Sequence, residues 1–185
     1  MNPPVIDFND PQTVWFDPTA KTPAYFCRSG PVKVDSGLIT QLKSEANRLG
    51  DNDVRLCLHF NPDANFHDMI ILQHARNYYR PHKHLPKGVT FHIIEGSLAV
   101  FVFNEDGQVF GFTVLKFRDS YVYRVEADTY YAAIPLSDVV IYHESKPGPF
   151  LRENDSLFPP WAPDGSQEDE VNTYKNNLLD LLPPS

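Results

Sequence analysis

The stretch VTFHIIEGSLAVFVF, residues 89–103, holds two β-rich runs, Val89–Ile94 and Leu98–Phe103, on either side of Glu95-Gly96. β-branched and aromatic residues favour strands, whereas glycine favours the turn between them. Each run is shorter than an ordinary helix, so the length of the runs also favours strands. The centre of the chain is therefore predicted to be β-rich.

Six further runs of the same kind lie on both sides of this stretch, and no helical pattern separates them. Asp106-Gly107, between two of the runs, is a typical hairpin turn. About eight strands without intervening helices predict an antiparallel sandwich or barrel. The further runs are Val54–Phe60, Asp68–His74, Val109–Leu115, Tyr121–Val125, Tyr131–Ile134 and Val139–His143.

Helical patterns flank the β-rich region on both sides. Apolar residues at helical spacing predict a helix at about 36–49, with Asp35 or Ser36 as its cap and Gly50 as its stop. The tail, residues 166–185, begins with acidic residues and predicts a second, shorter helix. Residues 1–34 show no sustained period and are predicted to form an irregular arm or a short edge strand. We expect one domain, residues 35–165, between this arm and the tail.

Charge and composition narrow the class of partner. The chain has 185 residues and a formal net charge of −8, which would repel nucleic-acid phosphates and anionic lipid. The beginning of the sequence lacks a basic segment followed by an apolar one, and no run is long enough to span a bilayer. We therefore expect a cytoplasmic protein that binds neither nucleic acid nor a membrane. Cys27 and Cys57 are too few for a disulfide scaffold and are predicted to be reduced, packed thiols.

The candidate site lies in the stretch Tyr79–His84, where His82 and His84 are two residues apart. In an extended strand such residues leave the same face, so both imidazoles can converge on one ion or one substrate atom. A carboxylate ligand would be expected a few residues later, but Lys87-Gly88-Val89-Thr90 stand there. Any metal site at this place is therefore incomplete or unusual.

Strand parity adds polar groups to the candidate site. In the run 54–60, apolar residues share one face, and Arg55, Cys57 and His59 share the other. The second face points to solvent in an ordinary sandwich, whereas in a barrel with a ligand cavity it points inward. His67 has the parity of Met69 and is expected at the mouth of a barrel, near the histidine pair. His74 and His92 have the opposite parity to the inward residues and are expected to be exposed.

A series of short motifs, in this order, resembles the cupin-fold metalloproteins of the WbuC type over roughly residues 36–165. The resemblance implies a cupin double-stranded β-helix, that is, a jelly-roll barrel with its site inside, and an association with bacterial surface-polysaccharide gene clusters. The motifs are Arg55-x-Cys57-x-His59, His67-Asp68-Met69-Ile70-Ile71, Pro81-His82-Lys83-His84, Ile94-Glu95-Gly96, Ile134-Pro135-Leu136-Ser137, His143-Glu144, Gly148-Pro149-Phe150 and Trp161-Ala162-Pro163.

The same resemblance implies a divalent transition metal, with iron, zinc, manganese and nickel as the candidates. Cupins typically bind such an ion through two histidines and a glutamate from one motif and a histidine from a second. His82 and His84 match the first two ligands, but Val89 falls at the glutamate position and Tyr131 at the second histidine position. Valine cannot coordinate a metal, and tyrosine is mainly a ligand for ferric iron. A site with only two protein ligands would bind the ion loosely unless His59 or His67 also coordinates it.

A metal-free enzyme is the first alternative. The dTDP-4-keto-6-deoxyhexose ketoisomerases are similar in having a His-x-His strand, and they use histidines as acid and base. By this analogy His82, His84 and Tyr131 would be the catalytic residues of a sugar-nucleotide isomerase or epimerase, and Arg55, His59 and His67 would bind the substrate. The ligand would be a small molecule, such as a sugar or a nucleotide sugar.

A non-catalytic cupin is the second alternative, because loss of two metal ligands is also what drift in a binding or dimerisation module would produce. We expect a homodimer in either case, since jelly rolls of this size often pair through an N-terminal strand or a sheet edge. His143, beside Glu144, is expected to be a structural hydrogen-bond partner.

Overall fold

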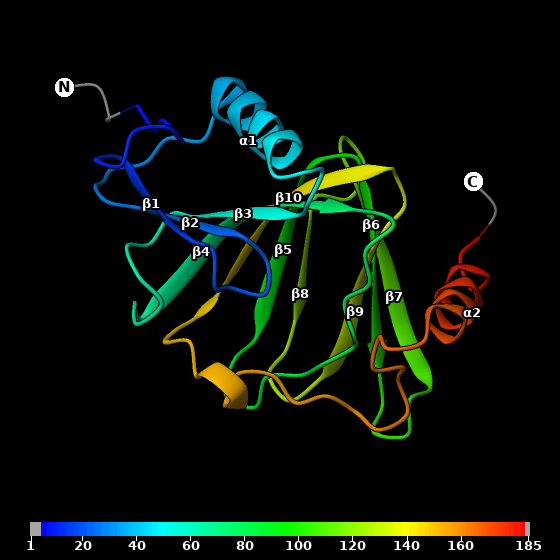
Figure 1. The fold of residues 1–185 in the computed structure, drawn as a ribbon. Coiled ribbons are helices and arrows are strands. Elements are labelled where there is room, and N and C mark those ends of the chain that lie inside the picture. The colour runs from blue at the N-terminus through cyan, green and yellow to red at the C-terminus, as the bar shows by residue number, and fades with distance from the viewer. Residues whose placement is uncertain (1–4, 184–185) are drawn as a thin grey trace.

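The computed structural model describes residues 5–183, which form two facing β-sheets with one helix outside each (Figure 1). The larger sheet has seven strands in the order β1-β2-β3-β4-β10-β5-β8, and the smaller has three in the order β7-β6-β9. The strands are β1 (Val14–Asp17), β2 (Ala24–Cys27), β3 (Val54–Cys57), β4 (Phe66–His74), β5 (Val89–Glu95), β6 (Ser97–Phe103), β7 (Val109–Lys116), β8 (Val122–Val125), β9 (Tyr130–Pro135) and β10 (Val139–Pro147).

This arrangement is the predicted cupin jelly roll. Each of the eight expected runs forms a strand, and every paired strand is antiparallel except β2 with β3. The stretch 89–103 passes from the larger sheet to the smaller at Gly96, which has a φ of 78°. A Cβ at Gly96 would clash with Ser137 and would lie 2.8 Å from the Val139 carbonyl oxygen. Glycine is therefore required at this corner for both backbone conformation and space.

The first 34 residues contribute more than the expected irregular arm or single edge strand. They provide two strands, β1 and β2, which extend the larger sheet beyond β3. The pairing of β2 with β3 is parallel and joins segments about thirty residues apart in sequence, which a local pattern cannot reveal.

The two helices that the sequence predicts are present, and they cover the outer faces of the sheets. Helix α1 (Ser36–Arg48) is capped by Asp35, whose carboxylate accepts a hydrogen bond of 3.1 Å from the Leu38 amide. Its apolar face packs on the outer face of β3 and β4. Helix α2 (Glu168–Leu179) packs Leu178 against the outer face of the smaller sheet. No helix among residues 5–183 is long and apolar enough to cross a membrane.

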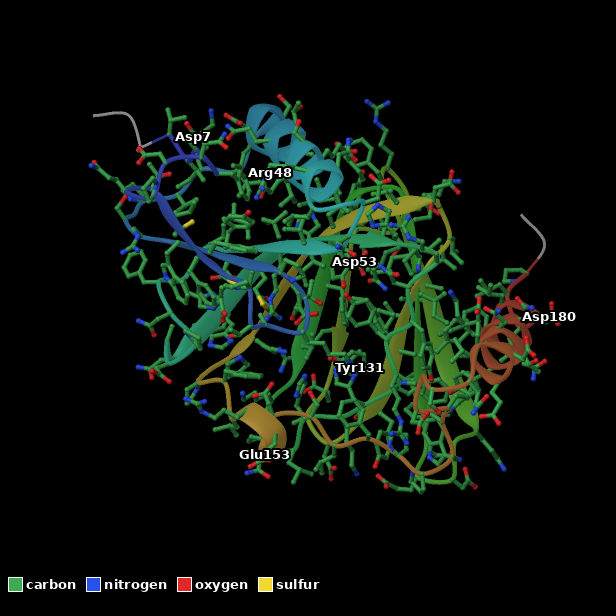
Figure 2. All side chains as sticks on the ribbon, in the orientation of Figure 1. Asp7, Arg48, Asp53, Tyr131, Glu153 and Asp180 are labelled. Carbon is green, nitrogen blue, oxygen red and sulfur yellow. The ribbon has the colours of Figure 1, made fainter. Side chains whose placement is uncertain are left out.

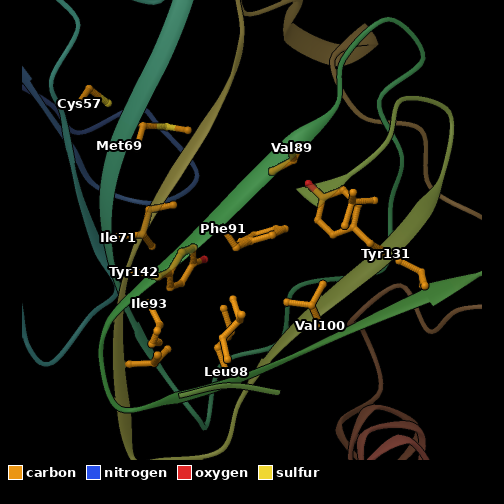
Figure 3. Close-up of a cluster of buried hydrophobic side chains, with 14 of the residues drawn as sticks. Cys57, Met69, Ile71, Val89, Phe91, Ile93, Leu98, Val100, Tyr131 and Tyr142 are labelled. Atoms are coloured by element: carbon orange, nitrogen blue, oxygen red, sulfur yellow. The ribbon is translucent and has the colours of Figure 1, made fainter. Parts of the chain in front are cut away.

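The space between the sheets is filled mainly by apolar side chains (Figure 3). Phe91 and Val100 face each other across it from β5 and β6, and Val89 is completely buried there. Val89 is therefore a core residue and not a vacant ligand position. Polar side chains enter the barrel at one end, beside the segment that follows β10.

That segment, residues 148–163, lies along one end of the barrel and is here called the strap. It includes the short helix η1 (Arg152–Asn154), seen in orange in Figure 1. The Gly148 and Phe150 amides donate to Asn65 and Pro62 in the loop before β4, and Leu157 pairs with Lys83 through two backbone hydrogen bonds. The strap is thus attached to both sides of the barrel mouth.

In the larger sheet, the face of the run 54–60 that includes Cys57 points into the barrel, and the apolar face points outward. Cys57 and Met69 lie in the barrel core, whereas Val54 and Leu56 pack under α1. His92 is exposed, as expected. The expectation that His74 is exposed is wrong, because its Nδ1 lies 2.9 Å from Asp53 Oδ1 and only 7% of the residue is accessible. His74 has the expected outward parity, but other chain segments cover that part of the outer face.

Candidate functional site

His82 and Tyr131 are held side by side by the backbone. The segment around His82 lies antiparallel to β9, and the amide of each residue donates to the carbonyl of the other, at 3.1 and 3.0 Å. Directly opposed residues in such a pair project from the same face. Figure 2 shows Tyr131 between the two sheets, toward the end of the barrel where η1 lies.

The Tyr131 hydroxyl lies between the two imidazoles. Its oxygen is 2.9 Å from His82 Nε2 and 3.3 Å from His84 Nε2. The other ring nitrogens face backbone carbonyls: His82 Nδ1 donates to Arg80 at 3.1 Å, and His84 Nδ1 donates to Asp155 of the strap. Both neutral rings must therefore carry their proton on Nδ1, which leaves both Nε2 atoms as acceptors. The single hydroxyl proton can satisfy only one of them at a time.

Strand β10 contributes two charged side chains that the sequence reading missed. Glu144 and Lys146 have the inward parity of Tyr142, and their carboxylate and ammonium groups are 3.3 Å apart. Lys146 Nζ also lies 3.4 Å from His84 Nε2. The predicted strand ended at His143, but β10 continues to Pro147. Extending the alternation by three residues, to Lys146, would have found both groups.

A buried ion pair lies behind His84. Lys87 and Asp155 are both more than 95% buried, and the Lys87 ammonium binds the Asp155 carboxylate and the Pro149 carbonyl. The second carboxylate oxygen of Asp155 lies 3.6 Å from His84 Nδ1 and 3.9 Å from Lys146 Nζ. Lys87, noted in the sequence only as the residue standing where a carboxylate was expected, thus anchors the strap.

Burial and neighbouring charges set the protonation of the cluster. Burial lowers the pKa of His82 to about 4, and His84 adds to the effect. The pKa of His84 is also lowered, by burial and then by Lys146. Burial, followed by Glu144 and Asp155, raises the pKa of Tyr131 well above its usual value. At neutral pH the site therefore holds two neutral imidazoles and a protonated phenol.

Glu144 stays ionised in spite of its position. Burial alone would raise its pKa, but the Lys146 ammonium, 3.3 Å away, is the main group that holds the pKa below its usual value. The pKa of Asp155 is lowered in the same way, since Lys87 and other partners outweigh burial. Two carboxylates and two lysines thus make an internally balanced charge cluster at the barrel mouth.

Two of the three predicted substrate-binding residues, His67 and His59, lie near this cluster. His67 on β4 is paired with Lys146 on β10, and its ring stacks on His59 with centroids 4.2 Å apart. Burial lowers the pKa of both histidines, that of His59 to about 4. Arg55 is half-buried, and its buried Nε has no hydrogen-bond partner among the residues that the structure describes. His143, by contrast, faces outward, with Nε2 3.0 Å from Asp68 Oδ1, which confirms the expected structural bond.

The residues at the site do not fit a divalent metal. The point toward which both Nε2 atoms face is occupied by the Tyr131 hydroxyl, and the Lys146 ammonium stands beside His84. Val89 supplies no ligand and packs in the core. Within residues 5–183 no three histidine, cysteine or acidic side chains are grouped so that they could hold a metal ion.

Comparisons with known proteins support the fold and leave the function open. A family described as a domain of unknown function, DUF6016, matches residues 34–115. No curated protein matches the chain. Among solved structures, protein SO0799 from Shewanella oneidensis is similar, with 12% identity, coverage of 77% of this chain and 98% of that one, and a TM-score of 0.52.

Two further cupin-fold structures are more distant. The capsular polysaccharide assembling protein CapF from Staphylococcus aureus has 13% identity and a TM-score of 0.47, and the match covers 57% of this chain and 29% of CapF. Cellulomonas parahominis L-ribose isomerase, solved with L-psicose, has 13% identity and a TM-score of 0.47, with 60% and 70% of the two chains covered. This chain spans less than a third of the length of four of the similar structures, CapF among them. At these identities the likeness concerns the fold alone, and the resemblance to the WbuC type in particular gains no support.

Proposed function

We propose that this cupin-fold chain binds a small carbonyl compound of the sugar or nucleotide-sugar class and moves a proton on it without a metal. The observation that carries the proposal is the Tyr131 hydroxyl, which lies within hydrogen-bonding distance of two imidazole nitrogens that backbone contacts keep unprotonated. A proton donor and two acceptors are thus prearranged at one point, as acid–base chemistry requires.

In the proposed reaction a C–H bond next to the substrate carbonyl breaks. The proton passes to Nε2 of His82 or His84, and the electron pair moves to the carbonyl oxygen. Tyr131, whose raised pKa keeps it protonated, donates a hydrogen bond to that oxygen. The imidazolium that forms at His84 is stabilised by Asp155, which faces its other nitrogen. Return of the proton to a neighbouring carbon, or to the other face of the same carbon, completes an isomerisation or epimerisation.

The substrate class rests on the resemblance to WbuC-type cupins and on the analogy with metal-free ketoisomerases. Both favour a role in bacterial surface-polysaccharide or nucleotide-sugar metabolism in the cytoplasm. Arg55, His59 and His67 would contact the polar remainder of the substrate. Arg55 is suited to an anionic group, because its guanidinium has a buried Nε without a partner among the described residues.

The test is exchange of substrate hydrogen with solvent. The protein is incubated in D₂O with a panel of nucleotide-linked 4-keto sugars, and deuterium incorporation is followed by mass spectrometry. We expect incorporation with the wild type, a loss of about 100-fold or more in Tyr131→Phe and His84→Gln, and no change in His92→Gln. The last variant is the matched control, since His92 is exposed on the outer face.

Two results would contradict the proposal. Exchange that is equal in all four proteins would show that these residues do no chemistry. Saturable binding of a sugar without any exchange would identify a non-catalytic binding module, the alternative that shares this fold.

A further inference from the structure

Lys146 is a largely buried lysine whose ammonium has no close acceptor among the residues that the structure describes. Its side chain is only 12% accessible, and its Nζ lies 3.3 Å from Glu144 Oε1, 3.4 Å from His84 Nε2 and 3.9 Å from Asp155 Oδ2. A hydrogen bond from an ammonium to a carboxylate is normally about 2.7–2.9 Å long. The ammonium is therefore surrounded by acceptors without being tightly bound to any of them.

Two other buried lysines near the barrel mouth are held more closely. Lys83 Nζ lies 2.6 and 2.8 Å from two carboxylates. Lys87 Nζ binds the Asp155 carboxylate and lies 2.5 Å from a backbone carbonyl oxygen. An ammonium has three N–H donors. Of these three lysines, Lys146 is thus the one that keeps a donor for a further acceptor at normal distance.

The Lys146 ammonium and the Tyr131 hydroxyl converge on one atom. Both face His84 Nε2, at 3.4 and 3.3 Å respectively. The unprotonated nitrogen has a single lone pair, so the two donors compete for it. A carbonyl oxygen has two lone pairs and can accept a hydrogen bond from each donor. The two groups are therefore better suited to an oxygen than to the nitrogen that they now share.

We propose that Lys146 is a catalytic residue of the reaction: together with Tyr131, its ammonium binds the substrate carbonyl oxygen and balances the negative charge that develops there. The inference rests on the proposed function and adds a cation to its oxygen-binding groups. When the oxygen takes up both donors, the lone pair of His84 Nε2 becomes free to accept the C–H proton. A hydrogen bond from a charged donor is about twice as strong as one between neutral groups.

The charges of the site fit this role. Two carboxylates balance two lysines in the resting protein. The proposed step creates one imidazolium, at His84, and one negatively charged oxygen. Asp155 faces the imidazolium, with a carboxylate oxygen 3.6 Å from Nδ1, and Lys146 would face the oxygen. Each new charge thus meets a charge of opposite sign that is already in place, as a preorganised site requires.

Acetate is the probe for this oxygen-binding role, because its carboxylate is a small oxyanion and its binding needs no turnover. Carboxyl-¹³C acetate is titrated into wild type, Lys146→Met and Lys146→Arg, and its NMR line width reports binding. We expect saturable binding in wild type and at least about tenfold weaker binding in Lys146→Met. Lys146→Arg should restore part of the affinity, since arginine keeps the charge. Deuterium exchange should fall about 100-fold in Lys146→Met.

Two further variants sharpen the comparison. Lys83→Met should bind acetate as wild type does, since the Lys83 side chain is equally buried but pairs with two exposed carboxylates. Lys146→Met combined with Glu144→Gln replaces the single variant if that variant does not fold, because no buried carboxylate then loses its partner. The double variant has the same expected loss of acetate affinity.

Three results overturn the inference. Wild type without saturable acetate binding is one, and it needs no variant to fold. A folded Lys146→Met that binds acetate as tightly as wild type is the second. The third is a loss of acetate affinity in Arg55→Gln but not in Lys146→Met, which would place the anion at Arg55.

Acetate binding and deuterium exchange are independent readouts. Acetate binding that depends on Lys146, in a wild type that exchanges no substrate hydrogen, would refute the proposed reaction and leave Lys146 as an oxyanion-binding group. Exchange that is equal in wild type and Lys146→Met would refute only the catalytic role of Lys146.

Discussion

Tyr131 belongs to two environments at once. Its ring packs in the barrel core, 5.6 Å from the Phe91 ring, while its hydroxyl faces His82 and His84. A residue that looks like the loss of a metal ligand in sequence is therefore a hydrogen-bonding partner of both histidines in the structure. Replacement of a ligand by a polar side chain does not by itself mean that the site has been abandoned.

The neutral histidines predict how stability depends on pH. In the folded protein the pKa of His82 is about 4, against 6.5 for an unperturbed histidine, because burial and His84 disfavour its charge. Between pH 6.5 and 4 the unfolded chain binds a proton that the folded chain does not, so the free energy of unfolding falls as the pH falls through this range. Above pH 6.5 His82 is neutral in both the folded and the unfolded chain, so this loss of stability is absent there.

Urea unfolding at pH 7.5 and pH 5 measures this dependence. Each such group contributes at most about 1.4 kcal/mol per pH unit. We expect the loss of stability between the two pH values to be smaller in His82→Gln than in wild type, and unchanged in His92→Gln. An equal loss in wild type and His82→Gln would show that His82 is not held neutral by the fold.

At the scale of elements, the strap and β10 build the site together with the stretch around His82. β10 supplies Glu144 and Lys146, and the strap supplies Asp155. The sequence predicted the eight strands β3 to β10 because each is a short local run rich in β-branched and aromatic residues. It could not predict Asp155, since that residue lies in an irregular segment and meets His84 across 71 positions of sequence.

The buried ion pair between Lys87 and Asp155 of the strap predicts an asymmetric mutational effect. Asp155→Ala should lower the free energy of unfolding by about 3–5 kcal/mol, because it leaves the Lys87 ammonium buried without its carboxylate. Lys87→Met combined with Asp155→Leu should cost much less, since neither charge remains. Asp63→Ala, at an exposed aspartate, is the control and should change stability by less than about 0.5 kcal/mol.

Urea denaturation of the three variants gives these values directly. If the double variant is as unstable as Asp155→Ala, the pair is important for its shape and hydrogen bonds rather than for its charge balance. In that case the packing of the strap, and not its electrostatics, holds the barrel mouth in place.

At the scale of the whole molecule, the fold was more predictable than the surroundings of individual residues. Local sequence patterns identified helix α1, which Asp35 caps, and the eight strands, because local spacing reflects which face is buried. It failed for His74, whose outward direction was right but whose burial depends on Asp53, twenty-one positions away. It also missed the second strand of the first 34 residues, since pairing with β3 is a long-range event.

The homodimer remains a prediction, and the structure suggests where to test it. β8 is one edge of the larger sheet, and exposed apolar side chains lie on it and on the connection from β7, among them Phe117, Tyr121 and Val122. Such an edge favours pairing with a second copy. Sedimentation equilibrium should show a dimer for wild type and a shift toward monomer for Val122→Lys. Phe16→Lys, on the opposite edge strand β1, is the control, and a monomeric wild type would contradict the prediction.

The strap acts on the site largely through backbone oxygens. His84 donates to the carbonyl of Asp155, Lys87 to that of Pro149 and Arg80 to that of Pro159. Every amino acid carries the same carbonyl, so most strap positions can change in the course of evolution without removing an acceptor. Gly148 is an exception, because a Cβ there would collide with the Ala64 carbonyl. Descendants of a common ancestor can therefore keep this architecture while their strap sequences drift beyond recognition.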